Sequence, residues 1–223
     1  MARTKLPGTG AARHGSGDRL LAMNAAHAAF RRDLMNLAGS ATRRNLGDPV
    51  RRQSIMNGWR MFTGMLQIHH AAEDEYIWPR LRARLARSES AVSTLDEMEA
   101  EHSLIDPLLA AVEAGFGRPD QLDVAAAIDE LTTTLSRHLA HEERDATPMI
   151  GEALSDREWR GVVRDIHGLV KSTGELSVTD FVPWLAEGVT REQEKVIATV
   201  LPAPIRPMYR WVLKPRYARV SRW

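Results

Sequence analysis

Apolar residues recur at three- and four-residue steps in four long segments of the chain, which is the spacing of helices that bury one face. The first segment runs from Asp18, a suitable N-cap, to Gly39, and the second opens at Asp48, which a proline follows. The third begins after a polar turn near Ser88, and the fourth follows the sequence GRPDQ. No alternating strand pattern and no Gly-rich phosphate loop accompany these segments. We therefore predict an all-α fold, an antiparallel up-down four-helix bundle.

Three regions follow from this pattern in the 223-residue chain. Residues 1–17 are Gly-rich and polar without periodicity, which predicts a disordered leader. Residues 18–152 are the predicted bundle. Residues 153–223 hold shorter helical patterns, with capping boxes at Ser155–Glu158 and Thr190–Gln193. Because these helices are too short for a core of their own, we expect the C-terminal helical extension to pack on the bundle.

The end of the chain, residues 201–223, differs in composition from the rest. It has six basic residues, four aromatic residues, four prolines and no acidic residue. Such a segment could contact an anionic membrane surface or a nucleic acid. The favoured interpretation is that it wraps around its own domain, with Trp and Tyr buried and the arginines in water.

The amino-acid composition excludes several kinds of binding site and cofactor. The net charge of +1 argues against a protein that binds nucleic acid over its whole surface. The absence of cysteine excludes disulfides, iron–sulfur clusters, thiolate-bound zinc and thiol nucleophiles, so any metal must be held by nitrogen and oxygen. The sequence also lacks a secretory signal and an apolar run of about 18 residues, and we expect a cytoplasmic protein.

One motif occurs twice. The sequences HHAAEDEYIWP and HLAHEERDATP, starting at His69 and His138, both read His, three residues, Glu, five residues, Pro. Each copy follows a helix that carries one inward histidine, His27 before the first copy and His102 before the second. The repeat predicts two αα-hairpins related by a pseudo-two-fold axis, each ending its second helix at the proline.

The spacing of the repeat places histidine and glutamate on the same helix face, turned toward the core. The predicted ligand set is His27, His69, Glu73, His102, His138 and Glu142. Without compensation, burying these groups would cost a large part of the roughly 5 to 15 kcal/mol by which domains are stable, and a cation is the most economical compensation. Six ligands are too many for one tetrahedral zinc, so we predict two metals that share both carboxylates as bridges. Iron is the best match to imidazole and carboxylate donors, with manganese or zinc as alternative occupants.

These residues resemble the motifs of the hemerythrin-like, or HHE, cation-binding domains over about residues 18–152. The C-terminal segments FVPWLAEG and LPAPIRPMYRWVLKPRYAR look similar to the extension on actinobacterial members of that family. The resemblance implies a non-haem di-iron centre with an oxo or hydroxo bridge that interacts with O2, NO or peroxide.

The chain departs from the oxygen-carrying members on the third helix. Those members present two histidines one turn apart, whereas here Asp106 follows His102 by four residues. A carboxylate at this position could ligate the second metal or accept a hydrogen bond from a ligand. Arg31 holds the matching position after His27 and could pair with an acid near the site.

Five further polar residues and a tyrosine lie close to the motifs. Tyr76 could reach the metal or donate a hydrogen bond to a ligand, although plain packing is the favoured interpretation. His70 and His141 are expected to rotate toward the bundle edge, away from the metal. Asp74, Glu75 and Glu143 are expected to form a solvated face.

Three functions agree with this site. The first is a protective or enzymatic centre that reacts with peroxide, O2 or NO. The second is a binding module without turnover, which stores or senses O2 or responds to iron. The third is a di-iron oxygenase that acts on an organic substrate. The pattern identifies no separate catalytic residue and no oligomeric state.

Overall fold

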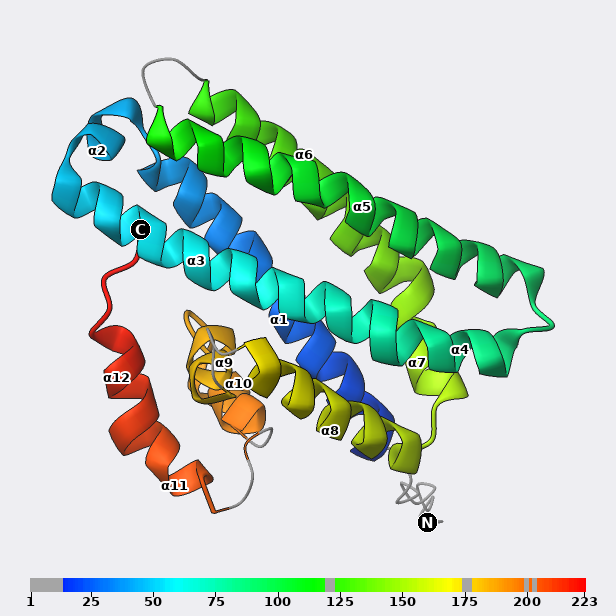
Figure 1. Ribbon diagram of the computed structural model, residues 1–223. Helices are drawn as coiled ribbons and strands as arrows, with labels where there is room; N and C mark the ends of the chain where they lie inside the picture. Colours follow the sequence, from blue (N-terminus) through cyan, green and yellow to red (C-terminus); the bar gives the residue numbers. More distant parts are fainter. Residues whose placement is uncertain (1–13, 119–122, 174–177, 199–200, 202–203) are drawn as a thin grey trace, which may run out of the picture.

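The computed structural model describes residues 14–118, 123–173, 178–198, 201 and 204–223. Every regular element among these residues is helical, which confirms the predicted all-α class. Figure 1 shows the long helices lying side by side, with the C-terminal helices packed across one side of them.

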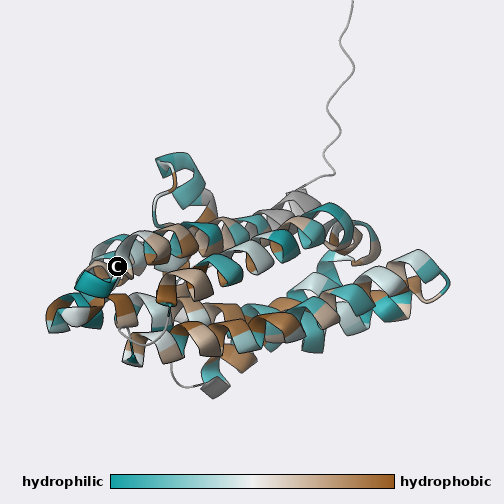
Figure 2. Ribbon diagram, turned by 90° about the horizontal axis from the view of Figure 1, so that it is seen from above, coloured by the Kyte–Doolittle hydropathy of each residue, from teal (hydrophilic) through white to brown (hydrophobic). Residues whose placement is uncertain are grey.

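Four long helices form the body of the fold: α1 (His14–Ser40), α3 (Pro49–Ala72), α5 (Glu89–Gly117) and α6 (Val124–His141). The short helix α2 (Arg43–Gly47) connects α1 to α3. Helix α1 packs against α3 and α6, and α5 packs against α6. Apolar residues concentrate on the surfaces that these helices turn toward one another (Figure 2).

The helix starts follow the capping residues in the sequence. The Asp48 carboxylate accepts hydrogen bonds from the first backbone N–H groups of α3, and Ser88 and Asp123 cap α5 and α6 in the same way. Two reciprocal capping boxes open the first and third helices of the extension, at Ser155 and at Thr190. All five starts agree with the sequence pattern.

The two copies of the repeat share a backbone irregularity. A π-helical turn begins at each glutamate: η1 (Glu73–Ile77) follows α3 and η2 (Glu142–Ala146) follows α6. In each turn the residue directly before that copy's proline bonds to the carbonyl five residues earlier: the Trp78 N–H donates to the Glu73 carbonyl, and the Thr147 N–H donates to the Glu142 carbonyl.

The prediction that each repeat ends at its proline was wrong. The chain stays helical through both prolines, as α4 (Trp78–Leu85) and α7 (Thr147–Ala153). A proline ring collides with the carbonyl four residues earlier in a regular helix. The wider π turn relieves this collision, so the helix continues instead of stopping.

Apolar residues form two clusters separated by a polar layer. The larger cluster contains Phe30, Leu66, Ile105 and Leu135, and the smaller contains Met23, Ile77, Met98 and Ala146. Each of the four long helices contributes one residue of each set, and in each helix, followed through its π turn where it has one, a histidine lies between the two. The order of the clusters along the chain reverses from each long helix to the next.

The C-terminal extension packs on this body. It comprises α8 (Asp156–Thr173), α9 (Val178–Leu185), α10 (Arg191–Ile197), α11 (Arg206–Met208), the π turn η4 (Tyr209–Leu213) and α12 (Lys214–Ala218). Helix α8 contacts α3 and α1, and α9 contacts α1. Trp184 of α9 is fully buried, and its Nε1 donates to the buried carboxylate of Asp33 at 2.8 Å.

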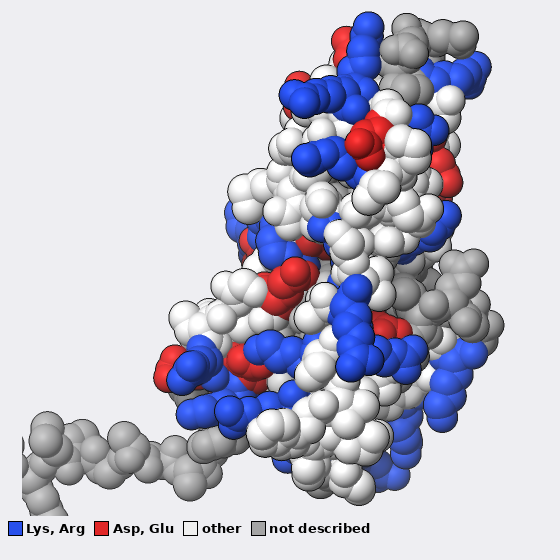
Figure 3. Space-filling view, turned by 90° about the vertical axis from the view of Figure 1, so that its left-hand side faces the viewer, with Lys and Arg blue, Asp and Glu red and all other residues white. Residues whose placement is uncertain are grey.

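The basic tail lies against the domain, but the expectation that its tryptophans are buried was wrong for Trp211. Tyr209, Leu213 and Tyr217 are buried in the larger cluster, and the Trp223 N–H donates to the Ser54 carbonyl on α3. Trp211 is 76% exposed, so contact of this tail with an anionic membrane stays a prediction. On the face shown in Figure 3, Lys and Arg side chains are widely distributed, with fewer Asp and Glu side chains among them.

Two boundary observations concern the ends of the predicted regions. Helix α1 begins at His14, four residues before the predicted start, while the rest of the expected leader lies outside the described residues. A long helix can extend over glycines such as Gly15 and Gly17 because each costs only about 1 kcal/mol relative to alanine.

Among the described helices, none combines the length and the apolar character needed to cross a membrane.

The contact between Trp184 and Asp33 yields a stability prediction. Trp184→Phe keeps an aromatic ring but removes a donor to a buried carboxylate, so the free energy of unfolding should fall by about 1–3 kcal/mol in urea titrations followed by circular dichroism. Trp211→Phe, at an exposed position, should change it by less than about 0.5 kcal/mol. Equal effects of the two changes would contradict this account of how the extension is attached.

Candidate metal centre

The polar layer contains one group of two histidines and two glutamates. His27 of α1, His69 of α3, Glu73 and Glu142 each place one ligand atom within 4.8 Å of the others. His27 Nε2 lies 3.1 Å from Glu142 Oε2, and His69 Nε2 lies 3.2 Å from Glu73 Oε1. The two Nε2 atoms are 3.2 Å apart. All four predicted residues therefore converge on one point, which could hold a cation.

A second group consists of three buried histidines, His70, His102 and His138, from α3, α5 and α6. The ring of His70 stacks on that of His102, with centroids 4.0 Å apart. The expectation that His70 turns toward the bundle edge was wrong. A bundle helix faces two neighbours, so adjacent residues can both point inward: His69 turns toward His27 on α1, and His70 turns toward His102 on α5.

The two carboxylates lie between the groups. Glu73 Oε2 is 3.5 Å from His102 Nε2, and Glu142 Oε2 is 3.9 Å from His138 Nε2. Both side chains are fully buried. Each glutamate thus approaches one histidine from each hairpin of the repeat, which is the placement needed to bridge two cations.

The donor set fits metal ions because its inward atoms are otherwise unsatisfied. Within the described part of the chain, the atoms without a hydrogen-bond partner include both oxygens of Glu73, Glu142 Oε2, and Nε2 of His70, His102 and His138. Buried polar atoms normally have partners, and leaving one without a partner costs about 1–3 kcal/mol. Six such atoms in one layer indicate that the site is built for cations that are bound through nitrogen and oxygen.

Carboxylates outside the layer orient three of the histidines. His27 Nδ1 lies 2.9 Å from Glu143, whose carboxylate also accepts two hydrogen bonds from Arg31. The expected pairing of Arg31 with an acid is therefore confirmed. Because an ionised carboxylate only accepts, it holds the proton on Nδ1 and leaves Nε2 free to face the layer.

The other hairpin has a matching contact. His102 Nδ1 lies 3.0 Å from both oxygens of Asp74, and His138 Nδ1 lies 2.9 Å from Glu101. Glu101 also binds His141, which is partly exposed and lies outside both groups, as expected. Glu75 is exposed, also as expected.

The expectation that Asp74 and Glu143 are only part of a solvated face was wrong. Each directly follows the glutamate of one copy of the repeat, and each binds the first histidine of the other hairpin. That shared offset was the signal that could have identified both residues. Glu101 precedes His102 and has no equivalent in the repeat, so only its position in space reveals its role.

Two further candidates lie elsewhere. Asp106 is exposed on α5, one turn past His102, and belongs to neither group of the layer. Tyr76 is partly buried against the smaller apolar cluster, which agrees with plain packing. It lies within η1, where the wider turn rotates it away from the face that carries His69 and Glu73.

Protonation in the metal-free chain follows from burial and neighbouring charge. Burial lowers the pKa of His69 and His70, which keeps these imidazoles neutral. Burial alone would also lower the pKa of His27, but Glu142 and Glu143 raise it to about 9. Burial and the Glu142 charge raise the pKa of Glu73. In the metal-free layer, His27 and Glu73 thus carry protons, and bound cations would displace these protons.

A model of the hemerythrin HHE cation-binding domain family matches residues 20–150, and the chain belongs to this family. It is also 26% identical over 180 residues to a BRUTUS-like zinc finger protein of Arabidopsis thaliana. That alignment covers 75% of this chain and 14% of the plant protein, so the chain spans about one seventh of its relative. No solved structure matches the chain.

The different positions of His70 and His141 yield a prediction about metal content. His70→Ala removes one of three imidazoles from the second group, so purified protein should lose about half of its bound metal by elemental analysis. His141→Ala serves as the control and should keep its metal, because this ring lies outside the layer. Loss of metal from both variants, or from neither, would exclude a ligand role specific to His70.

Replacing the buried carboxylate of Glu73 should have opposite effects on two properties: it should stabilise the metal-free chain and weaken metal binding. The raised folded pKa of Glu73 means that its contribution to stability is present below about pH 4.3, its unfolded value, and is lost as the pH rises toward the folded value. Glu73→Gln removes this dependence. The chelator-treated variant should therefore be more stable than the wild type by about 1–3 kcal/mol at pH 7, and equally stable near pH 4.

The same substitution should weaken metal binding, because an amide is a poorer bridge than a carboxylate. Glu75→Gln, at an exposed position, should change neither property. Urea titrations at both pH values, with and without metal, measure the two effects. A variant that is less stable than the wild type in the metal-free state at pH 7 would contradict the assignment of Glu73 as an uncompensated buried acid.

Proposed function

We propose that this chain is a non-haem di-iron protein that binds or reacts with O2, peroxide or NO. The observation that carries the proposal is the convergence of five imidazoles and two carboxylates with unsatisfied inward atoms. His27 and His69 would hold one iron, and His70, His102 and His138 the other, with Glu73 and Glu142 as bridges. Because both glutamates would be shared, the first position would have two histidines and the second three. The first position would therefore have more room for a small ligand.

Iron is the preferred occupant for chemical reasons. The chain has no thiolate, and imidazole together with carboxylate is the donor set of non-haem iron. Manganese and zinc accept the same donors and are alternative occupants. Membership of a cation-binding family supports metal binding as such, and the choice of iron is our proposal.

We also propose that the four long helices form an antiparallel up-and-down bundle. Along α1 and α5 the chain passes from the smaller apolar cluster through the histidine to the larger one. Along α3 and α6, continued by η1 and η2, it passes in the opposite order. Helices that meet the same three layers in alternating order must alternate in direction, which supports this topology.

The protein's part in the chemistry is to hold the ligands and to exclude water. When bound, the iron pair would supply redox and Lewis-acid chemistry. Glu143, Asp74 and Glu101 keep three imidazoles in the orientation that presents Nε2 to the layer. The apolar clusters flank the layer on both sides and limit its contact with bulk solvent.

A second candidate is an iron-responsive binding module without turnover, in the cytoplasm. It is favoured by the unsatisfied atoms of the layer, which destabilise the metal-free chain and so couple folding to metal loading. A large loss of helix on chelation, together with reversible O2 binding and no turnover, would favour this candidate over the first.

Activity measurements separate the two candidates. Iron-loaded wild-type protein should consume peroxide or NO at least about tenfold faster than the Glu73→Ala, Glu142→Ala double variant at equal concentration, because the variant lacks both bridges. Visible spectra of anaerobically prepared protein before and after O2, peroxide and NO identify the ligand. Equal rates for wild type and double variant would end the enzymatic proposal.

A further inference from the structure

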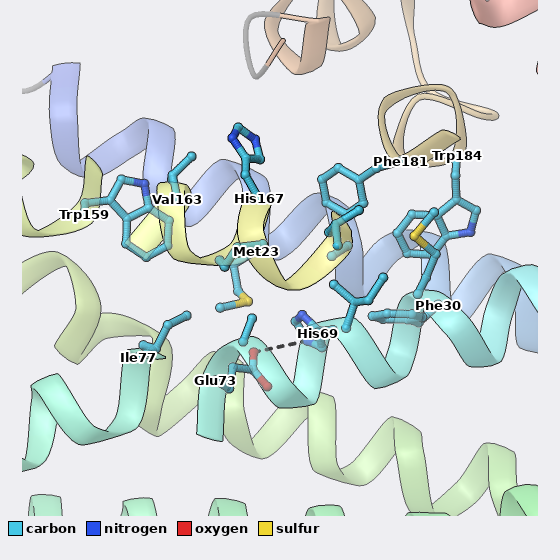
Figure 4. Close-up of a pocket in the computed structure, with 16 residues that line it drawn as sticks. Met23, Phe30, His69, Glu73, Ile77, Trp159, Val163, His167, Phe181 and Trp184 are labelled. Carbon is cyan, nitrogen blue, oxygen red and sulfur yellow. Dashed lines mark ion pairs between the residues drawn. The ribbon is translucent and has the colours of Figure 1, made fainter. Parts of the chain in front are cut away.

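A cavity lies between the bundle and the C-terminal extension. Its volume is about 130 Å³, and its lining comes from α1, α3 and η1 on one side and from α8 and α9 on the other. Figure 4 shows Trp159 beside Ile77 at one end and Trp184 beside Phe30 at the other, with Met23 between them. The cavity exists only because the extension covers this face of the bundle.

Apolar side chains dominate the lining. Aliphatic, aromatic and methionine side chains surround the space, and His69, Glu73 and His167 are the lining side chains that can ionise. Trp184 presents ring carbon to the cavity, because its Nε1 already donates to Asp33. Such a lining favours an uncharged ligand, since a charged one would be desolvated with few groups to compensate.

The cavity meets one of the two groups in the metal layer. His69 and Glu73, which belong to the first group, line it, and Figure 4 shows them at its floor joined by their ion pair. The three histidines of the second group do not contribute to the lining that is described. A molecule in the cavity would therefore lie against the position that has fewer protein donors.

The outer wall is fixed by specific contacts. Arg32 donates to the carbonyls of Trp184 and Glu187, and its guanidinium also pairs with Asp33. These bonds attach the end of α9 to α1, and Trp184 packs on Phe30 with ring centroids 5.0 Å apart. A wall held in this way is a preformed site rather than a gap between loosely packed helices.

We propose that this cavity binds a small, uncharged, apolar organic molecule about the size of one aromatic ring, and holds it against His69 and Glu73. This inference rests on the proposed metal function, for which it names a substrate class. The size follows from the volume of about 130 Å³, because an apolar cavity of about 150 Å³ accepts benzene. A conduit for diatomic gases is the competing use of such a space.

Binding is tested on the full-length, metal-free chain with benzene as the probe and 13C-labelled methionine methyl groups as reporters. Met23 and Met65 line the cavity, whereas Met35 and Met208 are exposed and serve as internal controls. Benzene should shift the first pair and leave the second unchanged. At ten times its dissociation constant it should raise the melting temperature by about 3–6 °C.

Matched probes and variants sharpen the test. Benzoate should bind at least about tenfold more weakly than benzene, because its charge would be buried. Val163→Phe fills the cavity and should weaken benzene binding at least about tenfold, while Val50→Phe, at an exposed position, should not. If Val163→Phe does not fold, the probe comparison on wild-type protein decides. Response to xenon but not to benzene, or equal response to benzoate, would overturn the proposal.

Proximity to the metal layer is measured separately. In protein loaded with Mn²⁺, bound benzene protons should relax faster than in metal-free protein, and this effect should vanish in the Glu73→Ala, Glu142→Ala variant. Benzene binding without enhanced relaxation in a metal-loaded chain would overturn placement against His69 and Glu73. A chain that binds no metal would refute the proposed function, while the metal-free titration would still decide whether the cavity binds the ring.

Discussion

The stability of the fold depends on how the free-energy cost of one buried polar layer is compensated. Five imidazoles and two carboxylates meet between two apolar clusters, with most of their inward atoms unsatisfied. Such a layer would destabilise a domain that is stable by only roughly 5 to 15 kcal/mol. The structure limits the cost through carboxylates that bind the outer imidazole nitrogens and through protons on Glu73 and His27. Cations would complete that compensation, so metal binding and stability are coupled here.

The π turns connect the repeat in the sequence to the geometry of the layer. Each begins at the glutamate of the repeat and ends shortly before the proline, which allows the helix to continue while its later residues rotate to a new face. Before each turn, the inward positions nearest to it carry the histidines of the layer, His69 and His138. At the end of each turn they carry apolar residues of the smaller cluster, Ile77 and Ala146. The same device on both hairpins places the two glutamates in equivalent positions.

The extension adds a further difference between the two groups of the layer, which already differ because His70 has no counterpart in the second copy of the repeat. It covers the side of α1 and α3 that carries His69 and Glu73, and there it forms one wall of a partly open apolar cavity. The second group of histidines has no described part in that cavity. Among the described residues, the first group thus borders the cavity and the second does not, which supports the proposal that a small molecule binds beside the first group.

The sequence alone determined the helices, their caps and six residues of the layer, because helical spacing and the repeated His-x-x-x-Glu unit are local properties of the chain. Tertiary structure decided the rest. His70 faces inward because α3 has two neighbours, Asp106 faces outward despite its spacing, and Tyr76 is turned aside by a π turn. Glu101 and the cavity depend on contacts between segments far apart in the chain. A periodic pattern reports one face of one helix, whereas such contacts depend on which neighbour each face meets.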